Sequence, residues 1–567
     1  MKQYIAIIVV ALVALVAVSC EKFLDVKPQG SVTTDNYFEN DQQCIDAVAA
    51  IYRKYADEEF LGRELYWEQG CCLDFAFGKA RPFPTLATLH YTGDENVIIS
   101  AFEYAYKMGL NYSNWIIQSL LKKQEKQELT AIEKRSIGEA LFARAHVHMI
   151  MAYRYGTKDL GIPFVAYEKV EGGYNNEIPE QQESVMKDYE LVIEDLKQAE
   201  EILPRFEEYD ASNRGRAHKA ACVAIMAKTY AYWAMWDKSK WDNVIACVDK
   251  LETVYGRDLH PSFDELFAAD FDKFWTKEYC WGYPSPGGKD YAGGGGVEFP
   301  GVCLENNGWS NELPAGLGYN GWGQFKPTLD IYEEMSKDNW EKDADGNLIK
   351  NARLAKSILE YGDEFTYYGF PFVFHAVQDI ETGFQIGKYM DAFKTADANT
   401  NTALDNEDWP CTRLMWPIVR FADCLLLRAE ANLVKGNKVA AAKDINRIRE
   451  RSHLKPIGSE ATWTDLYHER RCELVFELSA DHAFDCKRWA ISGDPEIKAL
   501  ALHELNTHPR VRHYKDRMDP YSTYEVGPYL DYQTPTKVWE EKYLTFPYPS
   551  EQIAKSAGKL RNPPSWQ

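Results

Sequence analysis

The sequence predicts a mainly α-helical protein, in which pairs of helices form a scaffold and long loop-rich insertions form a second, irregular lobe. Several segments carry apolar residues three and four positions apart, the spacing of one helix face. Tight turns join some of these segments in pairs. Between the pairs lie long stretches rich in Gly, Pro and Asn. Because 45% of the 567 residues are apolar and 14% are aromatic, the chain can bury a large core.

The chain opens with an apolar run that predicts a secretory signal. The 14 apolar residues Ile5–Val18 are too few to cross a bilayer, but they match the core of a signal peptide. Small residues then lead to Cys20, an arrangement that resembles the lipobox of bacterial lipoproteins, although Ala17 stands where Leu is preferred. We therefore expect a signal peptide at 1–19, lipid attachment at Cys20 and a flexible tether at 20–27. The alternative is an ordinary signal peptide with the cysteine placed by chance.

The charge of the chain excludes some classes of partner. A net charge of −22 argues against nucleic acid, whose phosphates must be neutralised by Lys and Arg. It argues equally against a chain that lies flat on anionic lipid. No later segment approaches the length of a membrane-spanning helix, so membrane contact is expected through the lipid anchor only.

Cysteine usage indicates packing rather than cross-linking. Of 12 cysteines, 11 remain once Cys20 is set aside for the lipid, and an odd number cannot pair completely within one chain. Most lie within apolar helical patterns, as Cys222 and Cys424 do. We predict that most are reduced core residues.

The helical segments resemble tetratricopeptide helix pairs. They lie near residues 137–156, 185–203, 216–255 and 418–451. Gly156 is a plausible C-cap, and Pro204 stops the second segment. Turns near Asp237–Ser239 and at Gly436-Asn437 divide the last two segments into helix pairs. The four helical segments are irregularly spaced along the chain, which excludes a regular 34-residue array. We therefore predict about four helix pairs in a curved scaffold that carries large loops.

Two stretches are candidates for ligand binding. Sugar rings present apolar C–H faces flanked by hydroxyls, so a surface site needs aromatic platforms with polar groups beside them. The first stretch is "LYWEQGCCLDFAFGKARPFP", residues 65–84, and the second is residues 279–327. The second combines Gly, Pro and Asn with aromatics, and the first offers a similar mixture. The candidates are Trp67, Asp74 and Arg81 in the first stretch and Trp281, Tyr283, Tyr291, Trp309 and Trp322 in the second. The alternative is that these aromatics anchor the loops themselves.

Other motifs do not support cofactor or metal chemistry. The glycines of Ala292–Val297 lack the Lys-Ser/Thr of a phosphate loop. The segment Glu341–Leu348 fails as a calcium loop because Ala352 would stand where a bidentate Glu is required, so Asp345-Gly346 indicates a turn. His146 and His148, two apart on a helix, point in different directions. We expect no cofactor, no metal and no zinc site.

The charged run around residues 468–477 is expected to be structural. Arg470, Arg471, Glu473 and Glu477 lie at spacings that permit local pairing on a helix. Asp485 and Arg488 are expected to tie helices together in the same way. No carboxylate pair framed for glycoside hydrolysis is evident, and we predict that the protein is not an enzyme.

Several ordered motifs resemble the SusD/RagB family of Bacteroidetes outer-membrane lipoproteins. The N-terminal "CEKFLDVKPQGSVTTDNYFEN" and "EALFARAHVHMIMAYRYG" resemble the family's start and its E-A-x-F-x-R-A helix. "RAEANLVKGN", "NRIRER", "ERRCEL", "DCKRW" and the closing "FPYPSEQ" with "RNPPSW" follow in family order. His482 stands near where the family has an Arg. The resemblance divides the chain into an N-terminal region (28–260), a loop-rich ligand-binding insertion (261–410) and a C-terminal region (411–567).

The resemblance implies a function as well as a fold. Such proteins face the cell exterior from the outer membrane, bind glycans and deliver them to a SusC-like TonB-dependent transporter. Some members bind peptides instead, as the RagB type does, so peptide capture is the first alternative. A surface glycoside hydrolase and a pure protein-binding scaffold are the less favoured readings.

Overall fold

The protein is described here by a computed structural model. The described residues are 37–55, 60, 65, 68–77, 83–106, 111–164, 179–267, 275–283, 325–367, 370–373, 382–388, 416–477, 482–516, 519, 521–529 and 537–567.

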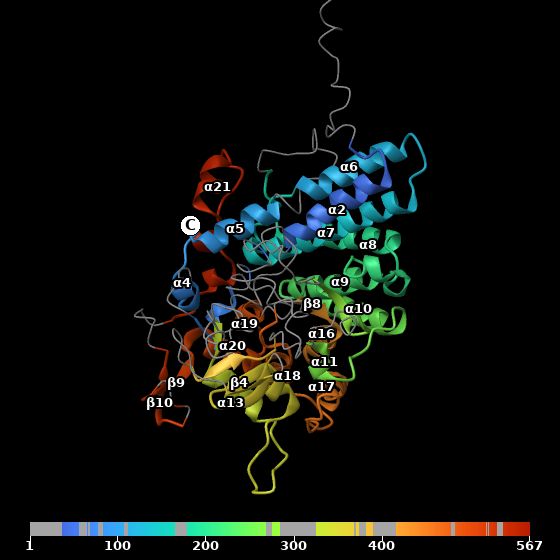
Figure 1. Ribbon diagram of the computed structural model, residues 1–567. Coiled ribbons are helices and arrows are strands. Elements are labelled where there is room, and N and C mark those ends of the chain that lie inside the picture. The colour runs from blue at the N-terminus through green and yellow to red at the C-terminus, as the bar shows by residue number, and fades with distance from the viewer. Residues whose placement is uncertain are drawn as a thin grey trace, which may run out of the picture.

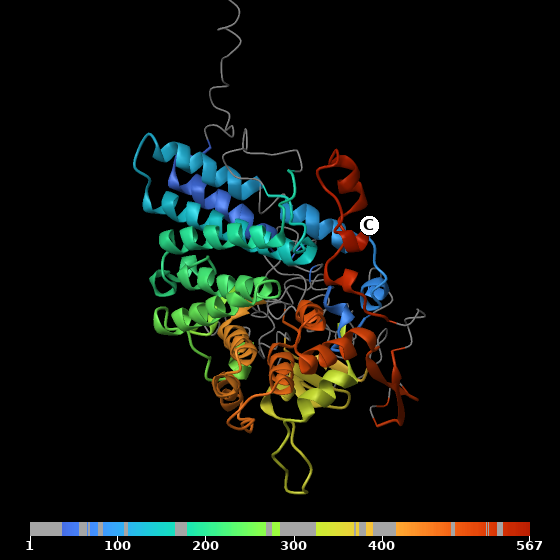
Figure 2. The same cartoon turned by 180° about the vertical axis from the view of Figure 1, so that it is seen from behind.

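Helices stacked one on another form a column along one side of the molecule (Figures 1 and 2). The column contains α2 (Asp41–Tyr55), α6 (Ser113–Gln124), α7 (Ala131–Tyr155), α8 (Val185–Ile202), α9 (Lys219–Trp233), α10 (Trp241–Thr253), α16 (Phe421–Val434) and α17 (Lys438–Arg451). Helices α7 to α10 each pack on the next, α16 packs on α10, and α17 packs on α16. Two helices from the C-terminal half therefore complete a stack begun by the N-terminal half. The four expected helical regions are confirmed.

Local sequence signals set the ends of these helices. Thr130 and Glu133 form a capping box at the start of α7, where Thr130 Oγ1 accepts from the Glu133 amide at 3.1 Å. Gly156 caps the other end, as predicted. Between α16 and α17, Gly436 has a φ of +77°, a conformation that glycine adopts without strain.

The remaining helices lie beside and below this column. The longer ones are α5 (Asn96–Ala105), α18 (Trp463–Leu474), α19 (His482–Ala490) and α20 (Pro495–Asn506). The shorter ones are η2 (Glu68–Cys71), α4 (Phe83–Ala87), η5 (Phe206–Glu208), η6 (Ala211–Asn213), η7 (Lys238–Lys240), α11 (Phe263–Leu266), α13 (Leu329–Ser336), α14 (Ala352–Ser357), η12 (Glu541–Leu544), α21 (Ser550–Lys555) and η13 (Pro564–Trp566). Buried residues from all three expected regions join one hydrophobic cluster.

The strands pair two by two as short antiparallel ribbons. The ribbons are β1 (Phe75–Phe77) with β3 (Phe325–Pro327), β2 (Tyr279–Tyr283) with β8 (Trp416–Arg420), β4 (Ile358–Glu360) with β7 (Phe384–Ile386), β5 (Glu364–Tyr367) with β6 (Phe370–Val373), and β9 (Arg510–Tyr514) with β10 (Tyr524–Pro528). The predicted turn at Asp345-Gly346 is confirmed: Gly346 has a φ of +88°, and its amide donates to the Asp343 carbonyl at 3.1 Å. This turn lies within the long loop that projects from the lower end of the molecule (Figure 1).

The described cysteines agree with the packing interpretation. Nine are free thiols, and eight of these are buried. Cys20, Cys303 and Cys411 lie outside the described residues. None of the described helices combines the length and the apolar character that crossing a membrane requires.

Candidate functional site: loop junctions and a buried ion-pair network

The structure places Trp281 in the core rather than at a ligand surface. Its side chain is 2% exposed, and its ring packs against Phe142 and Tyr52 at centroid distances of 4.8 and 5.9 Å. The reason is that strand β2 packs on α9, and the ring of Trp281 reaches aromatic rings of α2 and α7. Trp281 is therefore a packing residue, which corrects its assignment as a platform for sugar.

Asp74 is also buried. It is 3% exposed, and its Oδ1 accepts from Arg471 Nε at 2.7 Å. Burial raises the pKa of this carboxyl, while Arg471 and His482 oppose that rise. Asp74 thus connects the segment before β1 to helix α18 and is not available to hydrogen-bond a ligand at the surface.

The other predicted residues fall largely outside the described part of the chain. They are Cys20, Trp67, Arg81, Tyr291, Trp309 and Trp322. The backbone of Tyr283 is described: it ends β2 and pairs with Trp416 at the start of β8.

Two ribbons mark where the candidate segments join the folded body. In the first, Phe77 ends β1 opposite Phe325, which starts β3. Arg81 lies four residues after Phe77, and Trp322 lies three residues before Phe325. In the second ribbon, Tyr283 ends β2 directly before residues 284–324, and Trp416 starts β8 directly after residues 389–415. Because both ribbons are antiparallel, the departing and returning ends of each are neighbours.

Arg420, the last residue of β8 in the second ribbon, is the centre of a buried ion-pair network. It is 1% exposed and donates from Nη1 to Glu278 at 2.6 Å and to Glu473 at 2.7 Å. Its Nε donates to Glu477 at 2.7 Å, and Lys388 Nζ donates to the same carboxylate at 2.7 Å. Strand β8, the start of β2 and the end of α18 are therefore held by charge as well as by packing.

The network extends to the short helices in the lower half of the molecule. Arg353 in α14 donates to Glu469 of α18 at 2.6 Å and to Asp338, which follows α13, at 2.9 Å. Arg449 of α17 donates to the same two carboxylates at 2.8 and 2.7 Å. Two arginines from different helices thus share two acids.

A second cluster of ion pairs joins α16, α18 and α19. Arg470 donates to Asp485 at 2.6 Å and to Asp423 at 2.7 Å. Arg488 donates to Glu430 at 2.5 and 2.7 Å and to Asp485 at 2.9 Å. The expected role in tying helices together is confirmed. The expected local pairing is not the main arrangement, because most partners come from other segments.

The pKa values of these buried acids favour a structural role over a role in acid catalysis. Burial alone would raise the pKa of Glu473, but Arg451, Arg420 and Arg353 lower it to about 2. Burial opposes a low pKa at Glu477 too, and there Arg420 and Lys388 lower it. A glycosidase acid needs the opposite, a raised pKa that keeps the proton available.

These shifts predict acid-sensitive stability. The pKa of Glu473 falls on folding from 4.5 to about 2, so its stabilisation is present above pH 4.5 and is lost as the pH falls toward 2. We expect this carboxylate alone to account for about 3 kcal/mol of the free energy of unfolding over that interval.

The measurement is urea denaturation followed by circular dichroism at a series of pH values. A Glu473→Gln chain should show a flatter decline of stability in this range, because it takes up one proton fewer on unfolding. A Glu551→Gln chain, altered at an exposed acid, should keep the parent slope. Equal slopes in all three chains would contradict the assignment.

Sequence reasoning did not find several members of the network. Glu278, Asp338, Arg353 and Lys388 lie far along the chain from the run at 468–477. No spacing rule links residues so distant in sequence. The only signal is the excess of charged residues in an apolar context, which indicates burial with partners but does not name them.

The sequence matches two family models. One, described as the SusD family, matches residues 301–566, and the other, described as "Starch-binding associating with outer membrane", matches residues 22–231. No curated protein shows a significant match.

Solved structures resemble the whole fold. A SusD-like protein from Bacteroides fragilis gives a TM-score of 0.69 at 18% identity and covers 93% of this chain and 98% of its own. A structure solved with a xylogluco-oligosaccharide gives 0.69 at 19% identity, covering 92% and 98%. Surface glycan-binding protein A from Bacteroides thetaiotaomicron, in complex with laminarihexaose, gives 0.62 at 16% identity, covering 92% and 98%. These similarities confirm the predicted tetratricopeptide-like helical fold.

Proposed function

Because the chain belongs to the SusD family, we propose that it captures glycans at the cell surface and delivers them to a SusC-like TonB-dependent transporter. In this proposal Cys20 carries the lipid that holds the protein on the outer membrane, facing the exterior. The protein binds its ligand without cleaving it and uses no cofactor.

The observation that carries the proposal is the agreement between fold and loop chemistry. Two solved structures that share this fold were determined with oligosaccharides. In this chain the residues between β2 and β3 include Tyr291, Trp309 and Trp322 among glycines and asparagines. Aromatic rings stack on the apolar faces of sugars, and amides hydrogen-bond their hydroxyls.

The loop junctions support a single site built from both candidate stretches. Phe77, which ends β1 four residues before Arg81, pairs with Phe325, which starts β3 three residues after Trp322. We therefore assign Trp67, Arg81, Tyr283, Tyr291, Trp309 and Trp322 as candidate ligand residues. Trp281 and Asp74 instead support the ribbons on which these stretches are held.

The experiment is affinity electrophoresis and calorimetry of the chain from residue 21 onward against a panel of polysaccharides and oligosaccharides. We expect selective binding to one glycan class, with no cleavage products by chromatography. Binding to no glycan of the panel would favour the RagB-type peptide alternative. Release of shortened sugars would favour the hydrolase.

Replacing Trp309 and Trp322 with Ala should weaken glycan binding about 30-fold, because two stacking platforms contribute about 1 kcal/mol each. The melting temperature should change little. Trp340→Ala is the matched control: this tryptophan is 43% exposed at the base of the projecting loop and should not affect binding. Trp281→Ala should instead destabilise the fold by about 3–5 kcal/mol through the cavity it leaves. If the chain with both Trp309→Ala and Trp322→Ala binds glycan as tightly as the parent, these two residues do not belong to the site.

A further inference from the structure

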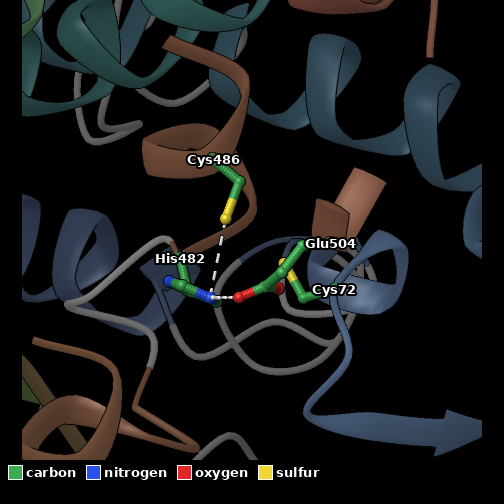
Figure 3. A group of neighbouring side chains, drawn as sticks. All are labelled: Cys72, His482, Cys486 and Glu504. Atoms are coloured by element: carbon green, nitrogen blue, oxygen red, sulfur yellow. Dashed lines mark hydrogen bonds and ion pairs between the residues drawn. The ribbon is translucent and has the colours of Figure 1, made fainter. Parts of the chain in front are cut away.

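A group of metal-ligating side chains lies buried away from the proposed glycan site. Cys72, His482, Cys486 and Glu504 each direct one ligand atom toward the others, and these atoms all lie within 4.8 Å of one another (Figure 3). We call these four residues the Cys–His–Glu cluster. Their exposed fractions are 1%, 7%, 0% and 0%, so the cluster is closed to solvent.

Three segments distant in sequence build this cluster. Cys72 follows η2 and precedes β1, His482 and Cys486 lie on α19, and Glu504 lies on α20. Residues four apart on a helix share one face, so His482 and Cys486 point the same way. Helix α20 packs on α19, which brings Glu504 beneath that face.

We propose that the Cys–His–Glu cluster is a structural zinc site, with Cys72 Sγ, Cys486 Sγ, His482 Nε2 and a Glu504 carboxylate oxygen as its four ligands. Two thiolates, one imidazole and one carboxylate are ligand types that Zn²⁺ takes in tetrahedral structural sites. From the sequence we expected no zinc site, because His146 and His148 point in different directions on their helix.

One distance within the cluster already matches a tetrahedral centre, and a second is slightly too short for it. Cys486 Sγ lies 3.5 Å from His482 Nε2. Zinc bonds of about 2.3 Å to sulfur and about 2.0 Å to nitrogen at a tetrahedral angle give a separation of about 3.5 Å. His482 Nε2 lies 2.9 Å from Glu504 Oε1, so a small outward shift of the carboxylate would admit the ion.

The surroundings orient the proposed ligands. The Glu504 carboxylate accepts from the Leu73 amide at 3.2 Å, and Tyr467 donates its hydroxyl to the same carboxylate. The backbone amide of His482 donates to Gln69 Oε1 at 3.1 Å. Outer contacts of this kind fix the direction of metal ligands.

Buried positive side chains near the cluster offset the negative charge of a site with two thiolates. Two thiolates and a carboxylate exceed the charge of one Zn²⁺, so a loaded site remains anionic. Arg471 Nε lies 3.6 Å from Glu504 Oε1. Lys537, 1% exposed, donates to the backbone carbonyls of Cys71 and Glu504 at 2.5 and 2.7 Å. Such buried cations stabilise a site that keeps a negative charge.

The test is zinc analysis of the full-length chain, purified in detergent under reducing conditions, exposed to Zn²⁺ and freed of excess. We expect one zinc per chain. Cobalt(II) in its place should give the visible bands of a tetrahedral ion together with thiolate charge-transfer absorption. This second readout needs no variant, so it stands even if a variant fails to fold.

Variants locate the site. Cys486→Ala should weaken zinc binding more than about 100-fold, since losing a ligand costs more than losing an outer contact. Cys222→Ala is the matched control, because Cys222 is fully buried on α9 and lies outside the cluster. Its zinc content should remain one per chain.

Three results would overturn the proposal. The reduced wild-type chain could bind neither zinc nor cobalt, in which case the cluster is a hydrogen-bonded group only. Cobalt could bind without thiolate charge transfer. Mass spectrometry of the native protein could reveal a Cys72–Cys486 disulfide, which would make the cluster a cross-link.

Discussion

A chain in which Arg420 is replaced by Met is expected to lose about 3–5 kcal/mol of its free energy of unfolding. Arg420 is fully enclosed and donates to Glu278, Glu473 and Glu477. Methionine fills much of the same volume but leaves three buried carboxylates without their shared cation. Removing one partner of a buried pair is costly because the remaining charge cannot be solvated. The measurement is urea denaturation at neutral pH.

Arg510→Met provides the comparison. Arg510 also binds two acids, Asp330 and Glu333, each at 2.7 Å, but 43% of its side chain is exposed. Solvent screens such pairs, so this substitution should cost less than about 1 kcal/mol. Similar losses in the two variants would mean that the buried network does not hold β8 to α18 as described.

Replacing Cys20 with Ala is expected to release the protein from the membrane. Acyl chains contribute about 0.8 kcal/mol per buried CH₂, and two or more together anchor a protein stably. Without the thiol the proposed lipid has no attachment point. In detergent phase partitioning the parent chain should enter the detergent phase and the variant the aqueous phase.

Cys247→Ala is the control for this experiment. Cys247 is a partly exposed free thiol on α10, and its loss should leave partitioning unchanged. A Cys20→Ala chain that stays in the detergent phase would contradict lipidation at this position. A control chain that also enters the aqueous phase would point to misfolding instead.

The sequence predicts the helical scaffold well because its signals are local. The stop at Gly156 and the turn at Gly436 each depend on a few neighbouring residues. Apolar spacing then identifies the faces that pack. The family resemblance also predicts the order in which the family motifs follow one another along the chain, which residue spacing alone does not reveal.

The sequence predicts the site less well because burial is decided by distant segments. Trp281 stands among residues typical of an exposed loop, yet α2 and α7 cover it. Asp74 resembles a surface acid until Arg471, almost four hundred residues away, is brought beside it. Cys72 and Cys486 each resemble an ordinary core thiol, and only the packing of α19 on α20 reveals their common neighbours.

The position of α16 in the helical column has a consequence for biosynthesis. Helix α10 receives its second neighbour from α16, which is made much later in the chain. A nascent or truncated chain that ends before Phe421 leaves one side of α10 uncovered, however well the earlier helices have formed. Closing so long a loop is slow, because its entropy is lost before the contact is gained. Acidic residues of α10 then lack the cation that α16 supplies, because Asp249 and Glu252 pair with Arg428 in the complete chain.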